Sequence, residues 1–188
     1  LGPGIKRIGY TPTTGGYSLG ENFMFLEVGE PYGLMKGWRW DGLWRADQED
    51  EARSYGQLPG LDHLADISGP NGVPDGQVDS DDKVNIGNGY PKFTWGWTNQ
   101  FSYKSFELAF LIIGSQGNDL FNTIRIRRQS SWEGVDPILF DEWTPQNQGT
   151  SIEKLYDGAT VEGMHLVDKY YTHGYQTTSK WVEDASFI

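Results

Sequence analysis

The clearest pattern in the chain is a two-residue alternation of apolar and polar positions between residues 92 and 113. Every second position of its first half is aromatic, with one interruption, giving the series Phe93, Trp95, Trp97, Asn99, Phe101, Tyr103. The second half continues the alternation with Phe106, Leu108, Phe110, Ile112. Side chains of a strand point alternately to its two faces. We therefore predict antiparallel strands over residues 92–102 and 106–113, joined by a tight turn at Lys104 and Ser105.

The length of these strands leaves two environments open. A tilted strand needs roughly 9–11 residues to cross a membrane, and an apolar face with aromatic residues near the strand ends is typical of an outer-membrane barrel wall. A hairpin of a soluble β-sandwich has the same alternation. The pattern predicts the hairpin, and it does not choose between lipid and a protein core.

Two other apolar groups predict strands. Residues 21–28 contain Phe23, Met24, Phe25 and Leu26, which suit a short strand. Further on, three tryptophans fall on one alternating series: Trp38, Trp40 and Trp44. On a strand they would share a face, either packed on a core or exposed as a platform on which a carbohydrate stacks.

Between these groups the chain is rich in turn-forming residues. We divide it into an N-terminal Gly/Pro-rich segment with a short strand (1–28) and a region over 29–188 that carries the hairpin strands near 92–103 and 106–113. Long loops are expected near 45–90 and 114–180, with a short helix or strand over 161–171 and a strand-like end over 181–188.

Composition narrows the class of protein. The 188 residues include 25 Gly and many aromatics (8 Trp, 10 Tyr, 9 Phe), which favours an all-β fold of antiparallel strands with long loops. The formal charge is 15 − 26 = −11, which disfavours binding to nucleic acid. There is no Cys, so disulfides and thiolate chemistry are excluded. The longest apolar run, residues 108–113, is far too short for a spanning helix.

No catalytic motif is present. The chain lacks the phosphate-binding, dinucleotide-binding, zinc-protease and nucleophile-elbow patterns. His63, His165 and His173 lack metal-ligand spacing, and we expect them on loops or at the surface. Adjacent carboxylates are common in so acidic a chain and do not by themselves indicate a glycosidase. We therefore expect no active site in this chain and no enzymatic activity.

One acidic stretch follows the pattern of a calcium-binding loop. Asp75, Asp79 and Asp82 would fill positions five, nine and twelve of an EF-hand-like loop, with Gly76 at the sharp turn. The first half departs from that pattern: Asn71 stands where the first ligand belongs, so Asp66 would serve only around a bulge, and Asp82 replaces the usual Glu. The candidate ligands are therefore Asp66, Asp75, Asp79 and Asp82, and the alternative is a solvated acidic turn.

Eight short segments resemble, in family order, the SusC/RagA-type TonB-dependent outer-membrane transporters. They cover residues 29–44 (GEPYGLMKGWRWDGLW), 55–60 (YGQLPG), 75–87 (DGQVDSDDKVNIG), 91–99 (PKFTWGWTN), 103–108 (YKSFEL), 114–122 (GSQGNDLFN), 142–147 (EWTPQN) and 181–188 (WVEDASFI). Each segment alone is weak, and the ordered set is specific.

The resemblance implies a fold and a function that the pattern alone does not. It implies a barrel of about 22 strands with an N-terminal plug. It also implies import of a glycan or peptide across the Bacteroidetes outer membrane, together with a SusD-like surface lipoprotein. TonB would act through an N-terminal part that these residues do not resemble. This chain would then supply a few C-terminal barrel strands, in contact with outer-membrane lipid, and extracellular loops. The alternative is a stand-alone extracellular β-rich carbohydrate-binding module that uses Trp38, Trp40 and Trp44.

Overall fold

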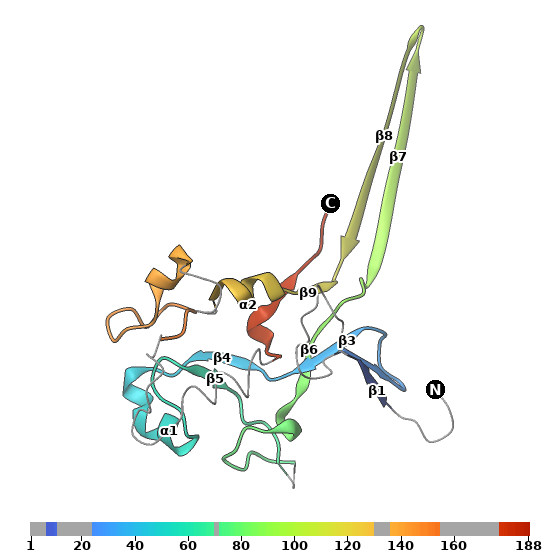
Figure 1. Cartoon of the computed structure of the whole chain (residues 1–188). Helices are drawn as coiled ribbons and strands as arrows, with labels where there is room; N and C mark the ends of the chain where they lie inside the picture. Colours follow the sequence, from blue (N-terminus) through green and yellow to red (C-terminus); the bar gives the residue numbers. More distant parts are fainter. Residues whose placement is uncertain (1–6, 11–23, 70–71, 130–135, 155–176) are drawn as a thin grey trace.

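A computed structural model describes residues 7–10, 24–69, 72–129, 136–154 and 177–188 (Figure 1). Its strands are β1 (Arg7–Tyr10), β2 (Met24–Glu27), β3 (Leu34–Gly37), β4 (Trp40–Leu43), β5 (Asp62–Leu64), β6 (Val84–Asn88), β7 (Phe93–Tyr103), β8 (Phe106–Gln116), β9 (Asp119–Phe121) and β10 (Val182–Asp184). The two α-helices are short, α1 (Glu49–Ser54) and α2 (Thr123–Gln129). Every strand ladder is antiparallel, which confirms the predicted fold class, and the described strands form no closed barrel.

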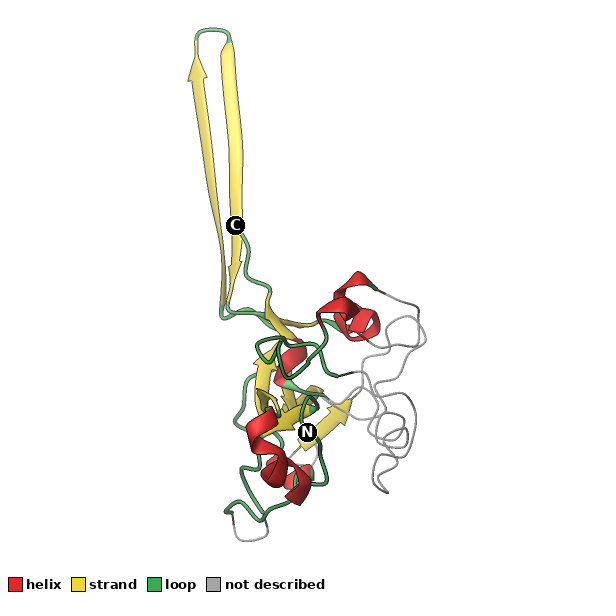
Figure 2. Ribbon diagram, turned by 90° about the vertical axis from the view of Figure 1, so that its left-hand side faces the viewer, coloured by secondary structure: helices red, strands yellow, loops and turns green. Residues whose placement is uncertain are grey.

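The predicted hairpin is confirmed, and it projects away from the rest of the molecule (Figures 1 and 2). Strands β7 and β8 have 11 residues each and pair along their whole length, from Phe93 opposite Gln116 to Tyr103 opposite Phe106. The turn holds only Lys104 and Ser105, as predicted. Lys104 has a φ of 54°, which a two-residue hairpin turn requires. Strand β8 runs three residues beyond the predicted end at Ile113.

The base of the molecule consists of small sheets. Four strands pair in the order β1-β2-β3-β6, and β4-β5 and β9-β10 form two further pairs. The strand predicted within residues 21–28 is confirmed as β2. The long loops expected near 45–90 and 114–180 are not plain loops: the first contains α1, β5 and β6, and the second contains β9 and α2. These strands escaped prediction because they are short and pair with partners far away in the sequence. Residues 161–171 lie outside the described residues.

The C-terminal segment, residues 177–188, is joined to this base by backbone hydrogen bonds. Trp38 N–H donates to the Thr177 carbonyl at 2.9 Å, and Ser179 N–H donates to the Trp38 carbonyl at 3.0 Å. Gly37 makes this approach possible, because a Cβ there would lie 1.9 Å from the Thr177 carbonyl oxygen. Further along, Phe187 pairs with Ser115 at the base of β8. The strand-like end predicted over 181–188 thus appears as β10 and this bridge.

Two small apolar cores support the base. One gathers Met35, Phe121, Ile126 and Trp181, and the other gathers Trp44, Ala52, Leu58 and Leu61. None of the described helices is long and apolar enough to span a bilayer.

Candidate functional site

The hairpin has two faces of different character. Residues directly opposite each other in an antiparallel ladder lie on one face. The register pairs Trp97 with Ile112 and Phe101 with Leu108. One face, called here the aromatic face, therefore collects the two apolar series: Phe93, Trp95, Trp97, Phe101, Tyr103, Phe106, Leu108, Phe110 and Ile112. The shared face predicted for the five aromatic residues of β7 is confirmed.

The aromatic face is exposed within the described residues. Trp97 and Phe101 each keep 55% of their surface accessible, and Phe106 keeps 81%. Phe110 lies between Trp97 and Phe101, with ring centroids 5.7 and 6.0 Å away. An exposed apolar surface of this extent marks a site of contact with lipid or with another protein surface.

The opposite face is mixed. Its cross-strand pairs are Thr94–Ser115, Gly96–Ile113, Thr98–Leu111, Gln100–Ala109 and Ser102–Glu107. An aromatic face backed by a face on which polar residues alternate with a few apolar ones resembles the alternation of a barrel wall that separates lipid from a wet interior, although Leu111 and Ile113 on this second face are apolar and exposed.

The tryptophan platform is wrong as a geometric prediction. The strand that should have carried all three rings breaks after Gly37, and β4 has an irregular register between Trp40 and Leu43. Trp44 is only 2% exposed and packs in a core. Trp38 donates its Nε1–H to the Asp79 carbonyl at 2.7 Å and lies beneath the ammonium of Lys83. The three indoles are held by separate parts of the chain and do not form one exposed surface.

Trp40 belongs instead to a buried charge cluster. Its Nε1–H donates to Asp62 Oδ1 at 2.7 Å, and Lys180 Nζ donates to the same oxygen at 2.8 Å. The Lys180 side chain is only 1% exposed. Glu153 Oε1 accepts the backbone N–H of Asp62 at 3.0 Å. Burial and the nearby Asp62 carboxylate raise the pKa of Glu153 to about 7, against the opposing pull of Lys180. This cluster could not be predicted from the sequence, because its members lie far apart in the chain.

The ring of Trp44 lies between two partners. His63 stacks on it with centroids 3.7 Å apart, and Tyr55 lies 5.9 Å away on a tilted plane. His63 was expected on a loop or at the surface, and it lies instead in β5, half-buried. Burial lowers its pKa despite nearby Asp41 and Glu51, so it stacks as a neutral imidazole. His165 and His173 lie outside the described residues.

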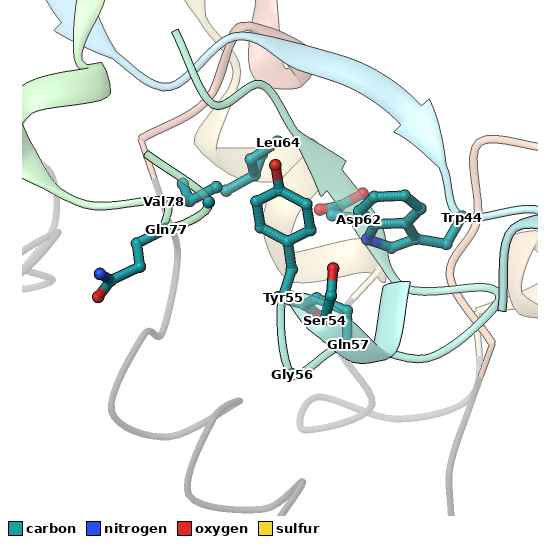
Figure 3. Close-up of a pocket in the computed structure, with 10 residues that line it drawn as sticks. Trp44, Ser54, Tyr55, Gly56, Gln57, Asp62, Leu64, Gln77 and Val78 are labelled. Carbon is teal, nitrogen blue, oxygen red and sulfur yellow. The ribbon is translucent and has the colours of Figure 1, made fainter. Parts of the chain in front are cut away.

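A cavity of about 390 Å³ opens beside Trp44 (Figure 3). The end of α1 and the residues after it form one wall, β5 another, and the acidic loop a third. Lining residues are Trp44, Ser54, Tyr55, Gly56, Gln57, Asp62, Leu64, Gly76, Gln77 and Val78. The hydroxyl of Tyr55 donates to Asp66 Oδ2 at 3.2 Å, which ties the cavity wall to the acidic loop. Burial, together with this hydrogen bond, raises the pKa of Tyr55, so its hydroxyl stays protonated.

The carboxylates of the acidic loop accept hydrogen bonds from backbone N–H groups of the same loop. Asp82, fully buried, accepts the backbone N–H groups of Ile67, Ser68 and Asp79 at 2.7–2.9 Å. Burial alone would raise the pKa of Asp82, and these hydrogen bonds outweigh it, so the pKa lies below its usual value. Asp66 likewise accepts from the backbone of Asp75 and Gly76.

The four candidate calcium ligands, Asp66, Asp75, Asp79 and Asp82, accept hydrogen bonds from the backbone and are not gathered around one point. Asp75 and Asp79 are exposed, and each accepts a backbone N–H two residues further along. Among the described residues, no group of three or more Asp, Glu or His side chains is placed to hold a metal ion.

The chain is similar in sequence to part of two TonB-dependent receptors. The chain is 30% identical over 173 residues to TonB-dependent receptor P26 of Formosa agariphila, which covers 90% of the chain and 16% of that relative. It is 25% identical over 166 residues to TonB-dependent receptor P3 of the same organism, covering 80% of the chain and 16% of that relative. The chain thus spans about a sixth of the length of the curated relatives it matches. No family model matches the chain.

Solved structures share the fold. The RagAB peptide transporter superposes with a TM-score of 0.61 over 99% of the chain and 17% of that structure, at 19% identity. The RagAB peptide importer in its closed-closed state gives the same values. TonB-dependent receptors are not enzymes, in line with the expectation from the missing catalytic motifs. The two relatives show that this chain is similar to a stretch of about a sixth of a TonB-dependent receptor, and together with the ordered motifs and the shared fold they support a fragment of a SusC/RagA-type TonB-dependent transporter.

Proposed function

We propose that the chain is part of a TonB-dependent importer in the outer membrane, and that β7 and β8 are two neighbouring strands of its barrel wall. The observation that carries this proposal is the register, which puts nine apolar side chains on one exposed face and a mixed series, polar mainly on β7, on the other. Eleven residues per strand suit a tilted crossing of the hydrocarbon layer.

The two-residue turn sets the orientation. Outer-membrane barrels have short turns on the periplasmic side and long connections outside. Lys104 and Ser105 therefore face the periplasm, and the base with its cavity lies on the extracellular side. There it would contact the imported glycan or peptide and a SusD-like lipoprotein. The match to a RagAB transporter supports a partner of this kind. TonB would act on a part of the protein that these residues do not resemble.

A charge placed on each face tests the membrane proposal. Ile112 lies on the aromatic face near mid-strand, and Thr98 lies one position away on the opposite face. A lysine on a lipid-facing site near the bilayer midplane costs about 2–4 kcal/mol. We expect Ile112→Lys in the whole protein to reduce its folded amount in the outer membrane strongly, and Thr98→Lys, the matched control, to leave it nearly unchanged. Equal loss in both variants, or in neither, contradicts the lipid-facing assignment.

The alternative of a stand-alone carbohydrate-binding module has less support. It relied on three exposed tryptophans, of which Trp44 is buried and Trp38 and Trp40 are hydrogen-bonded through their nitrogens. It also leaves the exposed aromatic face of the hairpin without a partner. Purification of the whole protein without detergent would favour the module over the importer.

Calcium binding by Asp66, Asp75, Asp79 and Asp82 stays a prediction. Asp75 and Asp79 are exposed next to the cavity residues Gly76, Gln77 and Val78, so an ion there would stiffen the cavity wall. Calorimetric titration with calcium should release heat in the wild type and less heat in Asp75→Ala. Equal heats, or no heat in the wild type, would leave the loop as a backbone-bonded acidic turn.

A further inference from the structure

The indole N–H of Trp44 is a buried donor without a hydrogen-bond partner among the described residues. The ring is 2% exposed and cannot turn to find one, since His63 stacks on one side and Ala52, Leu58 and Leu61 pack around it. Its backbone is fixed as well, through Trp44 N–H to the Leu61 carbonyl and Gly60 N–H to the Trp44 carbonyl. An unsatisfied buried donor destabilises the folded protein, so an acceptor that reaches this nitrogen recovers part of that free energy.

The donor is aimed into the cavity. Figure 3 shows the indole nitrogen on the edge of Trp44 that is turned toward Tyr55 and Ser54, both of which line the same space. The cavity's volume, about 390 Å³, lies in the range of small-molecule sites, roughly 300–1,000 Å³. A ligand seated there lies on the side of the ring toward which this nitrogen points.

The charges around the cavity decide what kind of oxygen this is. The described lining residues include one carboxylate, that of Asp62, whose Oδ1 already accepts hydrogen bonds from Trp40 and Lys180. The Asp66 carboxylate accepts the hydrogen of the Tyr55 hydroxyl, which adds a second negative charge near the cavity, and the formal net charge of the chain is −11. None of the described residues that line the cavity is a lysine or an arginine. An anionic acceptor would be repelled, so the acceptor is uncharged.

The remaining lining groups suit a molecule with several hydroxyls. Gln57 offers an amide, which both donates and accepts, and the Ser54 hydroxyl, which donates its hydrogen to the Glu51 carbonyl at 2.6 Å, still accepts. Leu64, Val78 and the Tyr55 ring offer apolar surface. Sugar rings combine hydroxyl edges with apolar C–H faces, and they are uncharged.

We propose that this cavity binds an uncharged sugar of one or two rings, with one ring oxygen or hydroxyl accepting the hydrogen of Trp44 Nε1. Trp44 thus contacts the sugar through its nitrogen edge and not by stacking. The inference rests on the proposed function for the source of the sugar, a glycan being imported, and it assigns the substrate contact to the base rather than to the barrel strands.

Calorimetric titration of the whole protein, purified in detergent, tests the proposal. The probes are D-glucose, D-galactose, D-mannose and maltose, with N-acetylglycine methylamide as an uncharged peptide unit. Trp44→Phe keeps an aromatic ring but removes the N–H together with the volume of the second ring, so its control must lose the same volume. Trp143→Phe is the matched control, since Trp143 is also 2% exposed with an unpartnered Nε1 among the described residues and does not line the cavity.

We expect at least one sugar to bind the wild type and Trp143→Phe equally and to bind Trp44→Phe about tenfold more weakly, the value of one hydrogen bond to a buried donor. Binding of no sugar, equal binding in all three proteins, or binding of the peptide unit alone overturns the proposal. Each result is separable from the importer proposal. Outer-membrane location is read from the Ile112→Lys and Thr98→Lys pair, so a located protein without sugar binding contradicts the cavity proposal alone. Sugar binding by a protein outside the membrane contradicts the importer alone.

Discussion

Lys180 Nζ lies 2.8 Å from Asp62 Oδ1, although 118 residues separate the two along the chain. Both side chains are largely buried, and the Asp62 oxygen also accepts from Trp40. Glu153 approaches the same cluster through the backbone N–H of Asp62. The charge of the Lys180 ammonium therefore acts on two carboxylates, those of Asp62 and Glu153. With all three side chains ionised, the cluster would carry a net negative charge.

This excess predicts a pH-dependent stability. The folded-state pKa of Glu153 is about 7, above its unfolded value of 4.5, so the folded protein holds a proton that the unfolded chain has released. The stabilisation is fully present below pH 4.5 and is lost as the pH rises through 7. Glu153→Gln keeps the acceptor for Asp62 N–H and should remove this part of the pH dependence, with higher stability than wild type above pH 7. Resistance to proteolysis across this pH range measures it. An unchanged pH profile in the variant would show that Glu153 does not carry the proton.

Asp82 should contribute strongly to the stability of the acidic loop. Asp82→Asn places an amide donor against one of three backbone N–H donors, so we expect a loss of about 2–3 kcal/mol. Because the folded pKa of Asp82 is depressed, its contribution is present above its unfolded pKa and is lost as the pH falls through its folded pKa. Urea unfolding measures the loss. Asp81→Asn, an exposed neighbour, is the control and should change stability little.

Gly37 should tolerate no side chain. The Cβ of Gly37→Ala would meet the Thr177 carbonyl oxygen, a backbone atom that cannot move aside, and separate β3 from the C-terminal segment. We expect a loss of about 2–3 kcal/mol and faster proteolytic release of that segment. Gly149→Ala, where a Cβ meets nothing within 4 Å, should behave as wild type. Similar proteolysis of the two variants would contradict the close approach.

Asn99 should weaken the hairpin if the aromatic face contacts lipid, as proposed above. It interrupts that face near mid-strand, opposite Phe110, where an amide in contact with lipid would lose hydrogen bonds to water. Asn99→Val should raise the thermal resistance of the folded protein in detergent gels, by a gain of about 1 kcal/mol. Gln100→Val, on the opposite face, should not. A gain in the second variant but not in the first would reverse the assignment of the two faces.

The hairpin could be predicted from the sequence because every requirement for it is local. The two-residue period, the shared face and the tight turn at Lys104 and Ser105 follow from neighbouring residues. The family resemblance was also a property of the sequence, since it rested on the order of short motifs. The acidic loop was located correctly, but its carboxylates were assigned to an ion or to solvent and not to the backbone N–H groups they accept.

The burial and the hydrogen-bond partners of Trp38, Trp40 and Trp44 were decided only by the tertiary structure. Alternation shows which side chains share a face of a strand, and it does not show whether the strand continues or what covers that face. Trp44 is buried because residues 52–63 fold back over it, and Trp40 is fixed by Asp62, which is held in turn by Lys180. Likewise, the cavity beside Trp44 exists only where α1, β5 and the acidic loop meet. Local periodicity is set by the backbone geometry of neighbouring residues, whereas burial, charge pairing and cavities depend on contacts between residues far apart in the chain.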